Sequence, residues 1–151
     1  MTIIAVKGRT MAADSMAVKG DVRTHLAPGD TKIIRAPDGS LVGSCGNSSD
    51  CWTLRQWVLD GMSFAQPPSF AHAASSDVSV DWLWLKTDGT AWRGDARMTV
   101  HPLLAPTTIG CSPAWQFTEA AMFLGLSAYD AVQFAITHCQ NIGGAVQVES
   151  L

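Results

Sequence analysis

Apolar and polar residues follow two different periods along this chain, and each period predicts one kind of element. Runs that alternate with a period of two, or that are short and β-branched, predict strands. The expected strands are residues 2–6, 10–14, 32–35, 40–43, 78–85, 90–92 and 145–148. Turn residues separate several of them, most clearly at Pro37-Asp38-Gly39 and Asp88-Gly89. Residues 16–31 are expected to form an irregular strand and loop, and residues 66–76 a loop.

Three other segments carry helix start and stop signals. The first helix is expected to begin at a Ser48 or Ser49 cap and to end at Gly61. Its apolar face is predicted to consist of Cys51, Leu54 and Val58.

Two further helices are expected near the C-terminus. One is predicted to start with Ser112 as N-cap and Pro113 in the first position, and to end at Gly125. Ser127 and Asp130 predict a capping box for the other. The expected apolar faces are Phe117, Ala120, Ala121 and Leu124 on the former helix, and Val132, Ala135, Ile136 and Cys139 on the latter.

The order of strands, one helix, strands, two helices and a strand predicts an α+β fold with antiparallel sheets covered by helices. No repeat or low-complexity tract interrupts it, so residues 1–151 are expected to form a single domain. The chain is 47% hydrophobic and 15% charged, where a lone domain usually has about a quarter charged residues. Together with six tryptophans, this favours self-association over the alternative of a well-packed monomer.

Charge and cysteine usage exclude several functions. The net charge is −3 and the basic residues are scattered, so no nucleic-acid partner is expected. No apolar stretch approaches the roughly 20 residues that span a bilayer, and no signal peptide is recognisable. The four cysteines lack CxxC spacing, so they are expected to be reduced, without a disulfide or metal site. These features predict a cytoplasmic protein without a membrane partner.

The candidate chemistry lies at the start of the chain, where Thr2 directly follows Met1. Removal of Met1 would leave a threonine that carries both a hydroxyl nucleophile and a free α-amino base. A retained Met1 would convert that amine into an amide and remove the base. We expect no propeptide before Met1, so unmasking would depend on methionine removal.

Four ordered segments carry a resemblance to a known family: Thr2-Ile3-Ile4-Ala5-Val6, Ala12-Ala13-Asp14-Ser15, Thr31-Lys32-Ile33, and residues 42–50, which read VGSCGNSSD. A weaker fifth is Ile109-Gly110-Cys111-Ser112. Together they resemble the proteasome β-subunit and HslV-type peptidases, most closely their short bacterial and phage-encoded members. The resemblance implies a four-layer αββα sandwich, assembly into stacked rings, and hydrolysis of peptides or unfolded proteins without a cofactor. An unfoldase or a virion is a further partner that it allows, with the host cytoplasm or the virion as the location.

The resemblance also implies roles for single residues. Thr2 matches the nucleophile, Lys32 the buried lysine beside it, and Asp14 the carboxylate that orients the lysine. Gly46 matches the glycine whose backbone N–H stabilises the oxyanion. Cys111 stands where the family usually has a serine that helps to handle the proton of the amine.

Other positions depart from the family pattern. Cys139 and Ile142 align with a further aspartate and serine of the family, and His138 is a nearby polar substitute for one of them. Ser112 is the neighbouring substitute for the serine that the family has at the position of Cys111. These departures leave a second hypothesis open, an inactive structural or assembly component, for which a phage is one candidate origin. A third hypothesis makes a cysteine the nucleophile; its candidates are Cys45 or Cys111, partnered by His25, His72, His101 or His138.

Overall fold

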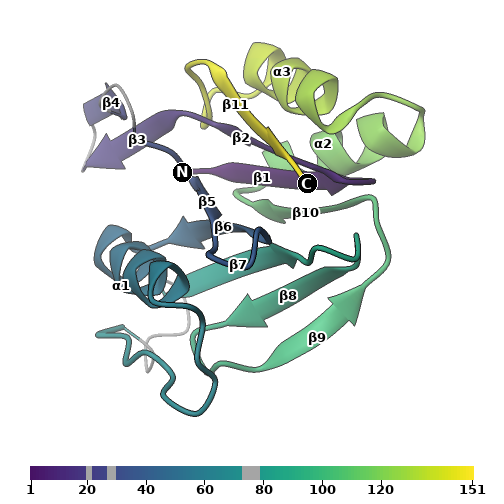
Figure 1. Cartoon of the computed structure of the whole chain (residues 1–151). Coiled ribbons are helices and arrows are strands. Elements are labelled where there is room, and N and C mark those ends of the chain that lie inside the picture. The colour runs from purple at the N-terminus through teal and green to yellow at the C-terminus, as the bar shows by residue number, and fades with distance from the viewer. Residues whose placement is uncertain (20–21, 27–29, 73–78) are drawn as a thin grey trace.

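The computed structural model describes residues 1–19, 22–26, 30–72 and 79–151. These residues form two larger antiparallel sheets and a small ribbon, with helices outside both sheets (Figure 1). The first sheet has the order β10 (Thr107–Gly110), β1 (Ile3–Lys7), β2 (Thr10–Asp14) and β11 (Val146–Ser150). The second has the order β5 (Ile33–Arg35), β6 (Leu41–Gly46), β7 (Val80–Leu85), β8 (Ala91–Asp95) and β9 (Val100–Leu103). The ribbon pairs β3 (Met16–Lys19) with β4 (Val22–His25).

Three apolar clusters hold these elements together. One packs α2 (Ala114–Phe123) and α3 (Ala128–His138) on the outer face of the first sheet, and a second lies between the two sheets. The third packs α1 (Ser48–Leu59) on the outer face of the second sheet. Because strand side chains alternate between faces, β1 sends Ile3 to the helix side and Ile4 to the other sheet. The predicted α+β fold of helices over antiparallel sheets is confirmed.

The two sheets approach each other closely at Gly43 in β6. A Cβ atom there would lie 2.6 Å from Ile4 Cγ2 and 2.9 Å from Met11 Sδ. Glycine is therefore required where the second sheet meets β1 and β2. This close approach brings the N-terminus and the β6–α1 connection to the same end of the molecule.

The helix starts differ partly from the sequence-based expectation. The N-cap of α1 is Asn47, whose side chain accepts a hydrogen bond from Ser49 N at 2.9 Å, so neither serine is the cap. Helix α2 begins at Ala114 with Pro113 in the cap position and no side-chain cap, so Ser112 is not the cap. The prediction for α3 is confirmed, because Ser127 Oγ accepts from Asp130 N at 3.1 Å.

The predicted apolar face of α2 is wrong at three of its four positions. Ala120 is exposed, and Phe117 is 44% and Leu124 85% exposed. The helix instead buries Ala114, Thr118, Ala121 and Met122. The small residues on this face let the helix pack tightly against the first sheet. This close packing stabilises the helix orientation more than burial of the Phe117 ring would. The predicted face of α3 is confirmed at Val132, Ala135 and Cys139, which are buried, whereas Ile136 is half-buried.

Strands β9 and β10 were not expected from the pattern. Pro102 interrupts β9, and proline in a strand is tolerated only where its missing N–H is not needed, as at the edge that β9 forms. The expected strand at residues 78–85 begins at Val80, with residue 78 outside the described residues. Residues 20–21, 27–29 and 73–76 of the two expected loops also lie outside them.

Candidate active site

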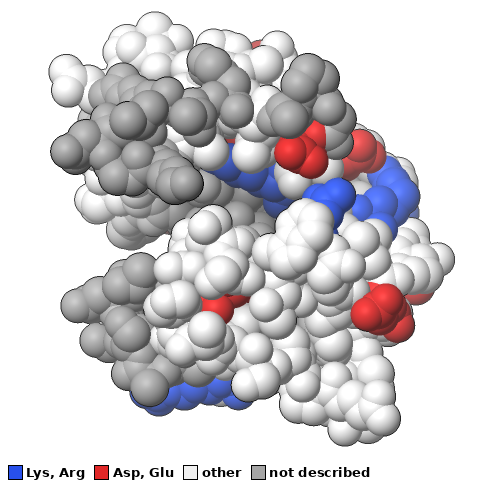
Figure 2. Space-filling view, turned by 90° about the vertical axis from the view of Figure 1, so that its left-hand side faces the viewer, with Lys and Arg blue, Asp and Glu red and all other residues white. Residues whose placement is uncertain are grey.

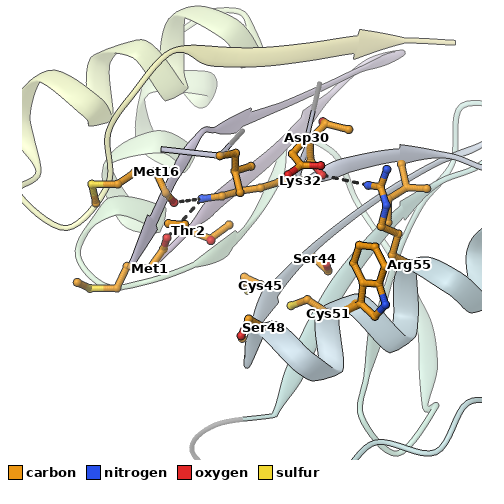
Figure 3. Close-up of a pocket in the computed structure, with 16 residues that line it drawn as sticks. Met1, Thr2, Met16, Asp30, Lys32, Ser44, Cys45, Ser48, Cys51 and Arg55 are labelled. Atoms are coloured by element: carbon orange, nitrogen blue, oxygen red, sulfur yellow. Dashed lines mark hydrogen bonds between the residues drawn. The ribbon is translucent and has the colours of Figure 1, made fainter. Parts of the chain in front are cut away.

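Lys32 lies at the centre of the site, immediately before β5, and its side chain runs between the ends of the two sheets (Figure 3). Its Nζ donates to Asp14 Oδ1 at 2.7 Å and to the Met16 carbonyl oxygen at 2.6 Å. A third, longer bond of 3.4 Å reaches the carbonyl oxygen of Met1, which belongs to the peptide bond before Thr2. The ammonium group is thus directed at the start of the chain.

Asp14, the last residue of β2, is completely buried, and backbone donors surround it. Oδ1 accepts from Ile3 N at 3.0 Å as well as from Lys32. Oδ2 accepts from the backbone N–H groups of Met16 and Gly143, both at 3.3 Å. Four N–H donors converge on this carboxylate and fix its orientation.

Burial and the aspartate act in opposite directions on the lysine. Loss of hydration lowers the pKa of Lys32 below its ordinary value, and the attraction and hydrogen bond of Asp14 oppose that change without cancelling it. Only 10% of the lysine side chain is exposed. The site therefore contains a cation that gives up its proton more readily than a surface lysine does.

Thr2 is tied in place by bonds on both sides of its backbone. Its carbonyl oxygen accepts from Cys111 N at 3.0 Å, and the next amide, of Ile3, donates to Asp14. A Cβ atom at Gly110 would lie 2.2 Å from the Thr2 carbonyl oxygen, so β10 packs directly against this residue. Figure 3 shows Thr2 close to the end of the Lys32 side chain. The structure thus brings Thr2, Asp14, Lys32 and Cys111 together.

A cavity of about 250 Å³ opens beside Thr2 and Lys32. Figure 2 looks onto the hollowed face between the two halves of the molecule. Ile34 and Cys45 from the second sheet, and Cys51 and Trp52 from α1, contribute much of its apolar wall. This size suits one large side chain with part of its backbone. A mostly apolar wall with a few polar groups is also typical of ligand pockets in proteins.

Gly46 also lines this cavity, at the end of β6. Its φ of +129° is one that side chains rarely adopt, and a Cβ atom there would lie 1.8 Å from the Ser79 carbonyl oxygen. Both facts require glycine at this position. The predicted site residues therefore share one end of the fold.

The cysteines near the cavity have low acidity. Burial raises the pKa of the Cys45, Cys51 and Cys111 thiols above the ordinary value. Such thiols stay protonated at neutral pH, whereas a nucleophilic cysteine needs a lowered pKa.

The described histidine side chains make other contacts or are exposed. His72 Nδ1 lies 3.3 Å from Asp50 Oδ2, and His138 is exposed and packs on the Phe134 ring. His101 is exposed on β9, and the side chain of His25 is outside what is described. Within the described part of the chain, no hydrogen bond joins Cys45 or Cys111 to a histidine. These observations argue against the cysteine-nucleophile hypothesis.

Cys139 and Ile142 occupy apolar surroundings. They are 6% and 3% exposed and belong to the cluster beneath α2 and α3. The backbone next to Ile142 does contact the site, because Gly143 N donates to Asp14 Oδ2 at 3.3 Å. Among the described residues, the contacts of Asp14 thus come from the main chain and Lys32.

Two side chains at the site were missed by the sequence-based prediction. Gln147 on β11 bonds to the segment 30–32, and Arg55 on α1 donates to the Thr31 carbonyl oxygen at 3.2 Å. Neither belongs to a recognisable motif, and only the packing of distant elements places them beside Lys32.

Comparisons with known proteins reveal similar structures but no similar sequence family. No protein-family model matches the sequence. No curated protein matches it either. Among solved structures, BPH of Thiobacillus denitrificans in complex with epoxomicin is similar with a TM-score of 0.69 and 18% identity, over 99% of this chain and 97% of that chain. HslV from Trypanosoma brucei is similar with a TM-score of 0.64 and 16% identity, over 99% and 98% of the two chains.

These similarities extend over nearly the whole chain, and they define its fold. The chain has an α+β fold like that of HslV. The resemblance found in the sequence is thereby confirmed at the level of the fold. No helix in the described ranges is both long and apolar enough to cross a bilayer.

Proposed function

We propose that this protein is a threonine-type peptidase in which Thr2, exposed by removal of Met1, attacks peptide bonds. The observation that carries the proposal is the contact of the Lys32 ammonium with both the buried Asp14 and the Met1 carbonyl oxygen, next to a cavity that Thr2 lines. A hydroxyl nucleophile needs an adjacent base and a local positive charge, and this end of the fold offers both once the amine is free.

In the proposed reaction, Thr2 Oγ attacks the peptide carbonyl carbon and its proton passes to the α-amine of the same residue, directly or through a water. The backbone N–H of Gly46 stabilises the tetrahedral oxyanion. Collapse of this intermediate breaks the C–N bond, and the protonated α-amine donates a proton to the leaving amine. A water molecule then hydrolyses the Thr2 ester in the same way and releases the carboxylate product.

Lys32 supports this chemistry by charge. A free α-amine has a pKa of about 7.7–8.0. A nearby ammonium disfavours a second positive charge, so Lys32 would lower the pKa of the Thr2 amine and keep it available as a base at neutral pH. Asp14 keeps the lysine charged and directed at Thr2. Cys111, whose thiol stays protonated, would take the place of the serine that the family has here. A thiol is a weaker hydrogen-bond donor than a hydroxyl.

We further propose that residues 1–151 form one domain with the four-layer αββα arrangement, assembled into a ring whose interior contains the sites. The exposed apolar side chains on α2 and α3 support burial in an assembly, because Phe123 is 70% and Leu124 85% exposed. Peptides or unfolded chains are the proposed substrates, and an unfoldase or a virion is the further partner that such a ring would serve. The proposed location is the host cytoplasm or the virion.

A second candidate function is that of an assembly component without activity. The observation that favours it is the apolar environment of Cys139 and Ile142, where the family has polar groups. In that case substitution of Thr2 by alanine would leave both assembly and biological role unchanged.

Intact-mass spectrometry of the purified protein tests the proposed function. We expect loss of Met1 and, after incubation with epoxomicin, a gain of one inhibitor mass at Thr2. Thr2→Ala should abolish the gain, whereas Thr10→Ala, which removes a hydroxyl bonded to Ser150 Oγ at 2.9 Å, should not. Retained Met1 without labelling would favour the inactive assembly component instead.

A further inference from the structure

The side-chain amide of Gln147 forms hydrogen bonds with all three residues of the segment 30–32, which contains Lys32. Its Oε1 accepts from the backbone N–H of Lys32 at 2.9 Å and from Thr31 Oγ1 at 3.5 Å. Its Nε2 donates to the Asp30 carbonyl oxygen at 2.8 Å. One amide therefore uses both its acceptor and its donor on consecutive residues of the same segment.

Among the described residues, two further hydrogen bonds hold the segment 30–32, apart from those of Gln147 and of the Lys32 side chain. It precedes the short strand β5 and follows residues that lie outside the description. Arg55 on α1 donates to the Thr31 carbonyl oxygen at 3.2 Å, and Thr31 Oγ1 accepts from Ile33 N at 3.0 Å. Gln147 lies opposite Ala13 of β2 in the pairing of β11 with β2, so it holds the backbone of this segment to the sheet that Lys32 reaches through its side-chain bond to Asp14.

We propose that Gln147 is a positioning residue, which holds the backbone of residues 30–32 so that the Lys32 ammonium meets Asp14 and the Thr2 end of the chain. The lysine stem is flexible, and ordering it costs entropy unless its backbone is already in place. A displacement of about 1 Å in a catalytic group is sufficient to reduce rates strongly. Gln147 is not among the residues that line the cavity, so it acts through Lys32 and not on substrate. This inference rests on the proposed function for its effect on rate, but its effect on Lys32 is independent of activity.

Glu149 provides a matched control on the same strand. Two residues beyond Gln147, its Oε2 accepts from Arg35 Nη2 of β5 at 2.7 Å. The pair also joins β11 to β5, but both side chains are nearly half exposed, and Arg35 is at the end of β5 away from Lys32. Glu149→Ala therefore removes a link between the same elements without touching the segment 30–32.

Two substitutions of Gln147 separate its contacts. Gln147→Met keeps the size and removes all three hydrogen bonds. Gln147→Glu keeps an oxygen acceptor for Lys32 N but has no N–H to donate to the Asp30 carbonyl oxygen. It should therefore change the position of Lys32 less than Gln147→Met does. Circular dichroism and thermal unfolding establish that each variant is folded before it is compared.

The first readout is the titration of Lys32, followed by the 13Cε resonance in lysine-labelled protein and assigned with Lys32→Arg. We expect the pKa of Lys32 to rise toward its ordinary value in Gln147→Met, because the lysine leaves its buried site, and to stay unchanged in Glu149→Ala. An unchanged titration in Gln147→Met would overturn the proposal, whether or not the protein is active.

The second readout is the rate of Thr2 labelling by epoxomicin as a function of pH. Gln147→Met should react about tenfold more slowly, the size of loss typical of supporting residues around active sites. The acid limb of its profile of labelling rate against pH should move to higher pH, because loss of the nearby positive charge raises the pKa of the Thr2 amine. A merely structural residue would lower thermal stability and leave this limb in place. Absence of labelling in the unsubstituted protein would contradict the proposed function, and the lysine titration would then decide the role of Gln147 alone.

Discussion

Lys32 Nζ lies 2.7 Å from Oδ1 of Asp14, a carboxylate with no solvent exposure. Asp14 ends β2 of the first sheet, whereas Lys32 immediately precedes β5 of the second. Their contact therefore exists only when the sheets face each other. The contact matters both for the stability of the fold and for the proposed chemistry. The same Lys32 ammonium group neutralises the buried Asp14 charge and points at the start of the chain.

Lys32→Met should be strongly destabilising. It leaves the Asp14 charge buried without its cation, and removal of one partner of a buried pair typically costs about 3–5 kcal/mol. Urea unfolding measures the change in free energy. Arg35→Met serves as the control, because the Arg35–Glu149 pair is nearly half exposed and its loss should cost less than about 1 kcal/mol. Equal losses in the two variants would show that the Lys32–Asp14 contact is no stronger than a surface pair.

Gly46→Ala should damage both the fold and the site. The added Cβ atom would lie 1.8 Å from the Ser79 carbonyl oxygen, at a φ of +129°. Gly61→Ala is the control that measures backbone strain without a steric clash, because Gly61 has a φ of +96° and nothing within 4 Å of the added atom. We expect about 1–3 kcal/mol of strain for Gly61→Ala and a larger loss for Gly46→Ala, measured by thermal unfolding. Labelling of Thr2 by epoxomicin should persist only in Gly61→Ala.

The raised pKa of Cys45 predicts a pH dependence of stability. The folded state holds the thiol proton more tightly than the unfolded state, so this contribution is present below the ordinary thiol pKa. As the pH rises above about 8.5, the unfolded thiol ionises first and the contribution falls by about 1.4 kcal/mol per pH unit. The difference in unfolding free energy between the unsubstituted protein and Cys45→Ala, in reducing buffer, isolates this effect from that of Lys32. A pH-independent difference would show that the folded thiol ionises normally.

The exposed end of α2 should matter for assembly. Phe123→Ser and Leu124→Ser replace apolar side chains that are 70% and 85% exposed, so they should cost the isolated subunit little stability. We expect them to shift the proposed oligomer toward monomer in native mass spectrometry, because apolar surface of this kind is stabilised by burial. Leu59→Ser at the end of α1, where the side chain is 44% exposed, is the comparison. Dissociation by Leu59→Ser alone would assign the interface to α1 instead.

Local patterns predicted most elements because they depend on neighbours in the chain. The capping box of Ser127 and Asp130 is an example, since both partners lie within one turn. The cap of α1 was misassigned by one residue, because Asn47 and the two following serines are all acceptable caps. The face of α2 was misassigned because exposed aromatic side chains and buried alanines invert the usual pattern.

Sequence alone predicted most of the strands and the three helices, because these depend on residue type and local order. The candidate site residues Thr2, Asp14, Lys32, Gly46 and Cys111 came from the order of the segments that carry the resemblance. Tertiary structure decided how these residues are supported. The N–H groups that hold Asp14 belong to residues 3, 16 and 143, and backbone donors leave no trace in residue type. Gln147 likewise gains its role only because β11 pairs with β2 and thereby lies beside the segment that carries Lys32. Contacts between residues more than a hundred positions apart form only when the sheets assemble.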